Sequence, residues 1–239
     1  MTRIPFAVLI GALAFTACDT TGTDLDPVAL NVQTATSIAA DPTSGRDPNT
    51  GQPLSNNLYT LYDLDAGEIV LASSETDATV RQRDSSSTVW DIGFKGSTII
   101  INGGTSGPGQ GAAQIVNEAF AAVTEAPAIG YTADGANTTC PEVVTPGGTV
   151  PGSSLAICTG SDNGWYSYSP QQNLLSPIAG RTIVLMTGDG NYAKVRILNY
   201  YEGNPATPDP NQDASRYFTF EYVIQPDGSR DFQETTPES

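Results

Sequence analysis

The sequence contains no histidine in its 239 residues. Histidine is the commonest general base of enzymes and the commonest protein ligand of transition metals. Its absence excludes the serine–histidine and cysteine–histidine pairs of nucleophilic catalysis and removes the usual nitrogen ligand of zinc. A carboxylate pair such as Asp162 and Glu202 would have to replace it, and nothing in the sequence places these two together. We therefore expect a protein that is not an enzyme and that has no structural metal site.

Basic residues are also scarce. Ten Lys and Arg stand against 26 Asp and Glu, which gives a formal net charge of −16. A surface of this sign repels the phosphate backbone, so nucleic acid is not an expected partner. Only 15% of the residues are charged, whereas Gly and Pro number 24 and 17. Such a turn-rich composition favours an all-β fold, mostly antiparallel and with little helix.

The N-terminus has the pattern of a lipoprotein signal peptide. A basic start precedes an apolar run that is too short to cross a bilayer as a helix. The run ends in Phe15-Thr16-Ala17-Cys18, which is similar to a bacterial lipobox. The pattern predicts that residues 1–17 are removed and that lipidated Cys18 anchors the chain to a membrane. The alternative is ordinary signal-peptide cleavage, in which Cys18 has no role.

The two other cysteines are expected to form a disulfide. With Cys18 lipidated, Cys140 and Cys158 remain in a chain exported to an oxidising compartment. The segment around them is rich in Gly, Pro, Thr and Ser and is interpreted as an irregular excursion. In the chain-entropy model, a bridge that closes such a loop contributes ~3 kcal/mol.

Aromatic residues are absent from residues 19–53, which contain several prolines. A segment of this composition buries too little apolar area to offset the ordering of its backbone. We therefore interpret residues 18–53 as a flexible tether that starts at lipidated Cys18. The folded β domain is then expected to comprise residues 54–239.

Alternating apolar residues predict strands in this domain. Residues 58–71 and 182–201 each contain two apolar runs around a turn, and the second turn has the Asp-Gly dipeptide typical of hairpins. Residues 217–224 alternate so that four large apolar side chains share one face. Residues 112–123 fit either a short helix or a strand, and the pattern leaves this open.

Residues 101–111 contain five glycines and a proline directly after an apolar run. Their spacing fits neither a phosphate-binding loop nor a dinucleotide-binding turn. A nucleophile elbow is excluded because Pro108 stands where the second glycine around Ser106 is required. We interpret the segment as an irregular connection between strands. Positive φ angles are expected at three of its glycines: Gly103, Gly104 and Gly107.

Four stretches together resemble the HmuY-like family of bacterial outer-membrane lipoproteins: residues 89–116, 164–168, 181–201 and 217–228. The most specific part is a Trp-Asp-Ile-x-Phe strand followed by an Asn-Gly-Gly-Thr-Ser-Gly turn. The likeness extends over about residues 54–232. It implies a hand-shaped, mostly antiparallel β fold that is displayed on the outer membrane or cell surface.

The resemblance also implies a function. The best-known members of this family bind haem and pass it to a TonB-dependent receptor, and two histidines or methionines hold the haem iron. Haem or a related porphyrin is therefore the expected ligand and cofactor, and iron acquisition the expected role. This sequence departs from the pattern, because it has no histidine and its mature part has one methionine, Met186.

Iron ligation would then need Met186 together with a tyrosine, which can hold haem iron. Other routes are a dimer that shares ligands, or a porphyrin held by packing alone. The plainer alternative is that Met186 is core packing and that the tyrosines are half-buried aromatics. The alternative function is an HmuY-like scaffold that lacks haem ligation and binds a partner protein or another ligand. The candidate haem-binding residues are Met186, Tyr131, Tyr166 and Tyr168.

Overall fold

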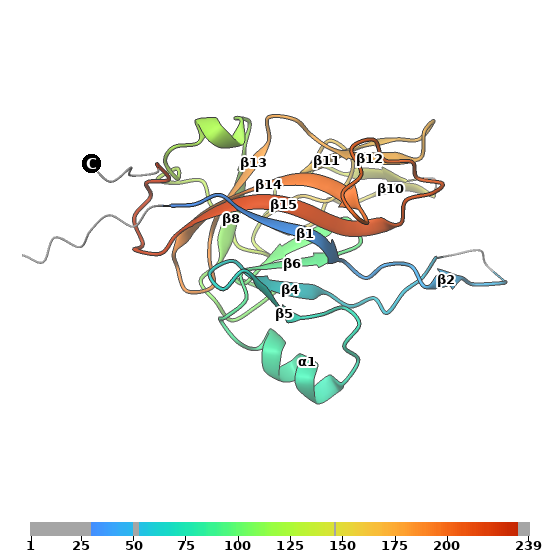
Figure 1. Cartoon of the computed structure of the whole chain (residues 1–239), viewed down its shortest axis with the longest axis horizontal. Coiled ribbons are helices and arrows are strands. Elements are labelled where there is room, and N and C mark those ends of the chain that lie inside the picture. Colours follow the sequence, from blue (N-terminus) through green and yellow to red (C-terminus); the bar gives the residue numbers. More distant parts are fainter. Residues whose placement is uncertain (1–29, 50–52, 146, 234–239) are drawn as a thin grey trace, which may run out of the picture.

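The computed structural model describes residues 30–49, 53–145 and 147–233. Its centre is a five-stranded sheet in the order β1-β15-β14-β13-β8, packed against a four-stranded sheet in the order β5-β4-β6-β7 (Figure 1). Every neighbouring pair is antiparallel, which confirms the predicted fold class. The five-stranded sheet consists of β1 (Gln33–Ala39), β8 (Ala112–Val116), β13 (Thr182–Met186), β14 (Tyr192–Tyr201) and β15 (Ser215–Gln225). The four-stranded sheet consists of β4 (Thr60–Asp63), β5 (Glu68–Leu71), β6 (Ile92–Lys95) and β7 (Thr98–Ile101).

Three small hairpins, one α-helix and one 3-10 turn surround these sheets. The predicted hairpins at residues 58–71 and 182–201 are β4–β5 and β13–β14. Residues 112–123, which fit two patterns, form strand β8 and then a 3-10 turn. The remaining elements are β2 (Gly45–Arg46), β3 (Pro53–Leu54), α1 (Ala78–Ser85), η1 (Phe120–Ala122), β9 (Val143–Thr145), β10 (Gly148–Val150), β11 (Tyr166–Ser169) and β12 (Leu174–Pro177).

The main core lies between the two sheets and is aromatic. Phe94 of the four-stranded sheet packs on Phe218 and Phe220 of β15, with ring centres 4.6 and 5.3 Å apart. The four alternating side chains predicted to share one face of β15 all belong to this core. Their burial supplies a large part of the hydrophobic stabilisation, because aromatic side chains remove the most area from water.

A smaller core covers the outer face of the five-stranded sheet. The ammonium group of Lys194 is buried in it and donates hydrogen bonds to the carbonyl oxygens of Phe120, at 3.0 Å, and Val123, at 2.8 Å. Burial lowers the pKa of Lys194. The alternation of β14 directs Lys194 toward the outer face of the sheet. Its side chain nevertheless lies beneath η1 and is not in water. The buried members of this cluster are Leu30, Phe120, Val123, Ala126, Val184, Val223 and Phe232.

The structure corrects the predicted tether. Residues 33–39 lie within the segment expected to be flexible, but they form β1 at the edge of the five-stranded sheet, paired with β15. Ala35 is buried in the main core, and the Tyr222 hydroxyl donates a hydrogen bond to Oε1 of Gln33 at 3.0 Å. An edge strand needs only small side chains at its inward positions, so the absence of aromatic residues does not exclude it.

The folded domain therefore includes residues from Leu30 onward, well before residue 54. Leu30 is 4% exposed. The predicted signal peptide, Cys18 and residues 19–29 of the predicted tether lie outside the described residues. Within the described ranges, no helix has the length and apolar composition needed to cross a membrane.

The five-stranded sheet has two ends that differ in construction. At the closed end, β1 begins near Gln33, and Tyr192 of β14 lies between Met186 and Gln225. At the open end, β1 ends at Ala39 and Tyr201 pairs with Ser215. Figure 1 shows the closed end on the left, near the C-terminus of the described chain, and the open end on the right, beside β2.

The glycine-rich segment lies at the closed end. Residues 103–109 form turns and bends without regular helix or strand, as predicted. Of the three glycines expected to have positive φ, Gly104 alone does, at 61°. A Cβ atom on Gly103 would lie 2.0 Å from the carbonyl oxygen of Gly111, and one on Gly107 would lie 2.1 Å from Oδ1 of Asn102. These two positions require glycine because other groups approach closely.

Asn102 organises this segment. The side chain is fully buried, and its amide donates to the carbonyl oxygens of Trp90, at 2.6 Å, and Ser87, at 2.9 Å. Its Oδ1 accepts a hydrogen bond from Gly109 N at 3.0 Å. A buried amide with these partners satisfies three backbone groups that would otherwise be costly to bury.

Asp91 links the same region to two neighbouring turns. Its Oδ2 accepts from Leu64 N at 2.8 Å, and its Oδ1 accepts from Gly188 N at 2.9 Å. Ligand oxygens of Asp63 and Asp65 lie within 4.8 Å of those of Asp91. Burial, together with these like charges, raises the pKa of Asp91 to about 7, although both hydrogen bonds act in the opposite direction.

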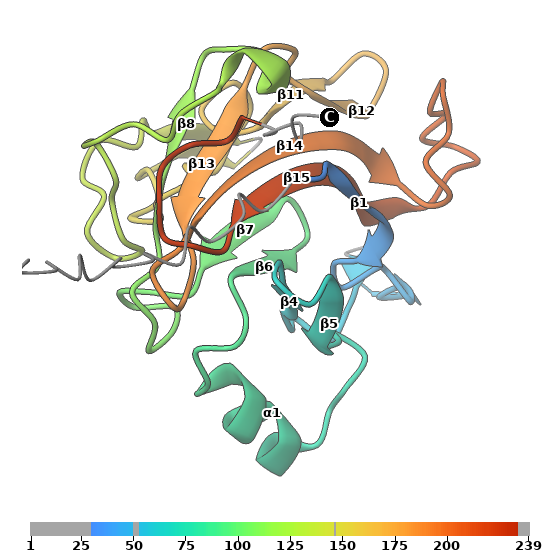
Figure 2. The ribbon, with the colours of Figure 1, turned by 60° about the vertical axis from the view of Figure 1, so that its left-hand side comes forward.

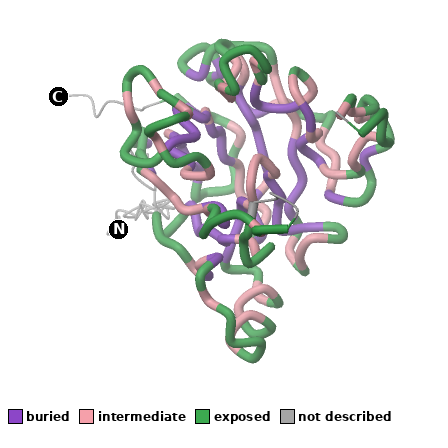
Figure 3. The backbone as a smooth tube through the Cα atoms, turned by 90° about the vertical axis from the view of Figure 1, so that its right-hand side faces the viewer, coloured by how far each residue is buried: buried purple, intermediate pink, exposed green. Residues whose placement is uncertain are grey.

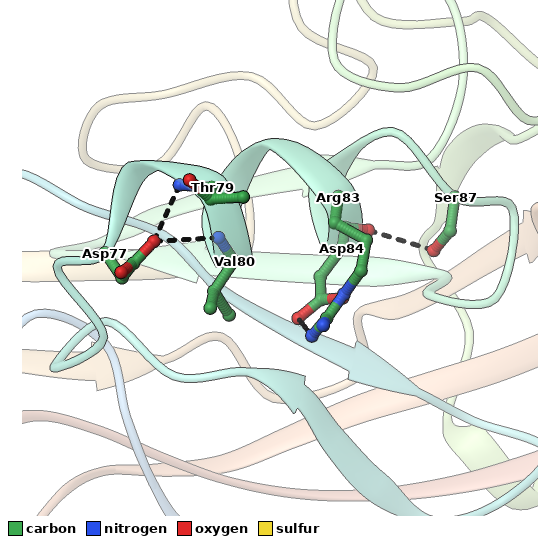
Figure 4. Close-up of polar contacts among 6 residues, drawn as sticks. All are labelled: Asp77, Thr79, Val80, Arg83, Asp84 and Ser87. Carbon is green, nitrogen blue, oxygen red and sulfur yellow. Dashed lines mark hydrogen bonds and ion pairs between the residues drawn. The ribbon is translucent and has the colours of Figure 1, made fainter.

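Helix α1 projects from the four-stranded sheet (Figures 1 and 2). Asp77 begins it, because its carboxylate accepts from Thr79 N at 2.8 Å and Val80 N at 3.1 Å (Figure 4). The helix contains no buried residue, and its tube at the bottom of Figure 3 is pink and green. Arg81 secures it by donating to three backbone carbonyl groups of the body.

The predicted disulfide between Cys140 and Cys158 is present, with Cα atoms 5.3 Å apart. It closes the excursion that carries the β9–β10 hairpin. Asp134, which is 1% exposed, fixes the same excursion to the main core, because it accepts from Ala156 N at 2.7 Å and Ile101 N at 2.9 Å. The excursion is thus held by a covalent bridge and by a buried carboxylate.

Candidate functional site

The candidate haem-binding residues fall into separate groups. Met186 ends β13 at the closed end, where it pairs with Tyr192 of β14. Tyr131 packs against the same Tyr192, with ring centres 5.9 Å apart. Burial raises the pKa of the Tyr131 hydroxyl to about 12. Iron binds the deprotonated phenolate, so this environment opposes ligation by Tyr131.

Tyr166 and Tyr168 belong to β11, far from Met186 along the sheet. Tyr166 is 9% exposed and packs in the main core, with its ring 5.0 Å from that of Trp165. Tyr168 is 41% exposed, and its hydroxyl donates to Oδ1 of Asn173 at 2.9 Å. Only the second of these tyrosines is open to a ligand from solution.

The length of β14 separates the two groups. This strand has ten residues, so its ends lie about 30 Å apart. Met186 lies beside the first residue, Tyr192, whereas the last residue, Tyr201, lines the same hollow as Tyr168. Two axial ligands flank one iron atom, so Met186 and Tyr168 cannot serve the same haem in one chain. This rules out the predicted Met186–tyrosine pair for Tyr168.

Two adjoining hollows lie at the open end, where β1, the β11–β12 turn and the β14–β15 loop meet. The larger one encloses about 510 Å³ and the smaller one about 160 Å³. They share Asn173, Pro210 and Ser215. The larger hollow is lined by Pro42, Thr43, Arg46, Asn173 and residues 210–217. The smaller hollow is lined by Tyr168, Asn173, Leu175, Tyr200, Tyr201, Pro210 and Ser215.

Local sequence explains the shape of this end. The β14–β15 loop is folded back on itself by Asp209, which accepts from Asn211 N at 2.9 Å and, through its carbonyl oxygen, from Asp213 N at 2.7 Å. Asn199 interrupts the regular register of β14, because its Oδ1 accepts from the amides of both Tyr200, at 2.8 Å, and Tyr201, at 3.0 Å. The consecutive tyrosines therefore both reach the inner side of the strand.

The larger hollow has two arginines in a chain that has only ten basic residues. Arg216 donates from Nη1 to the carbonyl oxygen of Asp41 at 3.0 Å. Its backbone has φ 70°, a left-handed conformation that is strained for a side chain other than glycine. Strain of this kind persists where the surrounding structure fixes it, and it is found most often at binding sites. The second arginine is Arg46 of β2.

The smaller hollow is aromatic and less polar. Tyr201 accepts a hydrogen bond from Leu175 N at 3.1 Å, which holds the β11–β12 hairpin over this hollow. Burial raises the pKa of Tyr200 well above its ordinary value, so its hydroxyl stays neutral. The two adjoining hollows thus bring tyrosines and two arginines to the same end of the sheet.

Sequence reasoning missed most of this site. Arg46 lies in the segment interpreted as a tether, and Asn173, Arg216 and Tyr217 belong to no recognisable motif. The adjacent tyrosines at the end of β14 were the one available signal, because a regular strand cannot direct consecutive side chains to the same face.

A model of the HmuY protein family matches residues 55–222. This chain belongs to the HmuY family. The family is one of binding proteins related to haem. The match begins after β1, so the strand that completes the sheet edge lies outside it.

Two solved structures are similar to this chain. The apo HmuY analogue of Tannerella forsythia is 17% identical, with a TM-score of 0.39, and the alignment covers 82% of this chain and 96% of that one. Apo PinO from Porphyromonas gingivitis is 16% identical, with a TM-score of 0.41, covering 83% and 99%. Both likenesses concern the fold alone. No curated protein matches the sequence.

Proposed function

We propose that the domain binds haem or a related porphyrin, without enzymatic activity, in the two hollows at the open end. The observation that carries this proposal is the pairing of a tyrosine-lined hollow with a larger one that contains Arg46 and Arg216. A volume of about 510 Å³ lies within the range of small-molecule sites, roughly 300–1,000 Å³. Membership of the HmuY family supports the same ligand class.

The chemistry of a porphyrin fits a tyrosine-lined hollow that adjoins one with two arginines. Its flat apolar ring would pack on Tyr217, and its two carboxylates would pair with the arginines. Arginine suits carboxylates because its planar group presents two parallel donors. In a protein of net charge −16, two arginines at one hollow give an acidic ligand a local attraction that opposes the overall repulsion.

Tyr168 is the iron ligand of this proposal. It is the one candidate haem-binding residue that lines either hollow. Haem itself would supply the iron chemistry, while Tyr168 would offer a hydroxyl oxygen to the iron and the arginines would bind the carboxylates. Met186, Tyr131 and Tyr166 have packing roles.

A titration of residues 30–239 with haemin and, separately, with metal-free protoporphyrin tests the proposal. We expect saturable binding of both and a shifted Soret band for haemin alone. Tyr168→Phe should abolish the shift but keep protoporphyrin binding, and Arg216→Gln should weaken both ligands about tenfold. The matched control, Met186→Leu, should change neither. Absence of saturable binding at micromolar protein would overturn the proposal and favour a scaffold that binds a partner protein or another ligand.

We also propose that the chain is exported, lipidated at Cys18 and displayed on the outer membrane or cell surface, where a TonB-dependent receptor would take the ligand. The lipobox-like sequence supports the anchor. Incorporation of labelled palmitate into the wild-type chain, and its loss in Cys18→Ala, is the expected result. Equal labelling of both would contradict the assignment of Cys18.

A further inference from the structure

The anchor and the folded domain are close together along the chain. The structure is folded from Leu30, which is buried against Phe120 and Phe232 on the outer face of the sheet. Cys18 precedes Leu30 by twelve positions. Even a fully extended chain of that length spans no more than about 40 Å. The predicted tether of residues 18–53 would have allowed several times this freedom of position.

The two hollows lie at the opposite end of the same strand. β1 begins three residues after Leu30 and ends at Ala39, and the next residues, Pro42 and Thr43, already line the larger hollow. The ten residues of β14, which lies two strands from β1 in the same sheet, show that the two ends of the sheet are about 30 Å apart. Figures 1 and 2 show the β14–β15 loop at the far side of the sheet from the C-terminal part of the described chain.

From this geometry we infer that the membrane-anchored protein stands with its closed end toward the bilayer and its open end toward the aqueous phase. The inference rests on the proposed lipid anchor but not on the identity of the ligand. With the closed end turned outward, the hollows can lie against the lipid surface only when the short connection is stretched almost to its limit along the side of the domain. That state is rare, because it sacrifices nearly all conformational freedom of the connection.

This orientation also determines from which side a ligand arrives. A porphyrin dissolved in the bilayer would have to leave it and travel the length of the domain, whereas a ligand carried in the aqueous phase meets the hollows directly. A protein that delivers or removes the ligand must therefore reach over the domain to its outer end.

Energy transfer to a labelled bilayer tests this orientation. The full mature chain, acylated at Cys18, is placed in phosphatidylethanolamine–phosphatidylglycerol vesicles that carry an acceptor dye on their headgroups. Donor dyes are attached to Asn211→Cys at the open end and, as the matched variant, to Ser229→Cys beyond β15 at the closed end; both residues are exposed. We expect at least about twofold higher transfer from position 229, because the two sites differ in depth by roughly the length of the sheet.

Two controls separate the possible failures. A long Gly-Ser insertion between Asp26 and Pro27 should reduce the difference between the two positions. Equal transfer from both positions without the insertion, or higher transfer from position 211, would overturn the orientation. Failure of the acylated chain to float with the vesicles would instead overturn the lipid anchor, whatever the orientation.

Discussion

The closed end of the five-stranded sheet is filled with backbone and buried amides, whereas its open end leaves two hollows between side chains. At the closed end, the side chains of Asn102 and Asp91 form hydrogen bonds with main-chain groups of the protein itself. At the open end, Tyr168 and Arg216 face a space that a ligand could occupy. One sheet thus has an end held by buried hydrogen bonds and an end with open space for a ligand, as expected when binding residues stand on a fixed scaffold.

The largest effect is expected from Gly103→Ala at the closed end. The added methyl group would meet the carbonyl oxygen of Gly111 at 2.0 Å, and a backbone atom cannot move aside without displacing the loop. We expect a loss of more than about 3 kcal/mol in unfolding free energy. Urea denaturation measures it. Gly147→Ala, whose added atom would meet nothing closer than 3.8 Å, is the control and should stay within about 0.5 kcal/mol of wild type. Similar losses of unfolding free energy for both variants would contradict the conclusion that close contacts require glycine at position 103.

The second effect concerns pH. The folded protein holds the proton of Asp91 up to a pH of about 7, and the unfolded chain releases it near its ordinary pKa of 3.8. The stability contributed by this proton is therefore complete below about pH 4 and is lost as the pH rises to about 7. Asp91→Asn removes the titration. The stability of the variant relative to wild type should rise by about 2–4 kcal/mol between pH 4 and pH 8.

Urea unfolding of both proteins across this range provides the measurement. The charged groups that face Asp91 are Asp63 and Asp65, and both act to raise its pKa. Asp65→Asn should therefore move the transition of wild-type stability to lower pH. Parallel pH profiles for wild type and Asp91→Asn would show that Asp91 is not the group responsible.

A smaller effect is expected from Tyr201→Phe at the open end. The change removes the hydroxyl that accepts from Leu175 N, and a typical hydrogen bond of this kind contributes about 1 kcal/mol. Amide hydrogen exchange should become faster at Leu175 and its neighbours in β12, while the amides of β6 and β7 keep their protection. Unchanged exchange at Leu175 would mean that the β11–β12 hairpin is held by its side-chain packing alone.

The smallest effect on stability is expected from Tyr168→Phe. Its hydroxyl bonds to Asn173 at an exposed position, where water replaces the contact readily. The free energy of unfolding should change by less than about 0.5 kcal/mol. The same substitution is expected to remove the haemin spectral shift. Tyr168→Phe should therefore affect ligand binding and leave the stability of the fold nearly unchanged. A loss of several kcal/mol would make Tyr168 part of the scaffold and not of the site.

Much of the fold could be read from local patterns. The Asp-Gly hairpin of β13–β14 and the aromatic face of β15 follow from alternation and turn chemistry alone. β1 was not predicted because its sequence has no aromatic residues and no clear alternation of apolar residues. It forms a strand because it pairs with the exposed edge of β15. Positive φ was expected at Gly103 and Gly107 for a local reason, but the actual reason is contact with Gly111 and Asn102, which only the folded chain brings near.

The candidate site was less predictable than the fold. Met186 and Tyr168 are both plausible iron ligands by residue type, and only the register of β14 shows that they lie at opposite ends of the sheet. Arg46 and Arg216 are far apart in sequence. They line the same hollow because β1 and β15 are neighbours in the sheet. Residue type is a local property, whereas a binding site depends on which distant segments meet.

The pairing of β1 with β15 also sets the order in which the protein can fold. The hydrogen bond between Gln33 and Tyr222 joins positions 189 residues apart. Contacts between such distant segments form slowly, because the whole intervening chain must first be ordered. The first strand of the domain can take its place only after the last strand has been synthesised. Until then, the nascent chain lacks one edge of its five-stranded sheet and the burial of Ala35 in the main core.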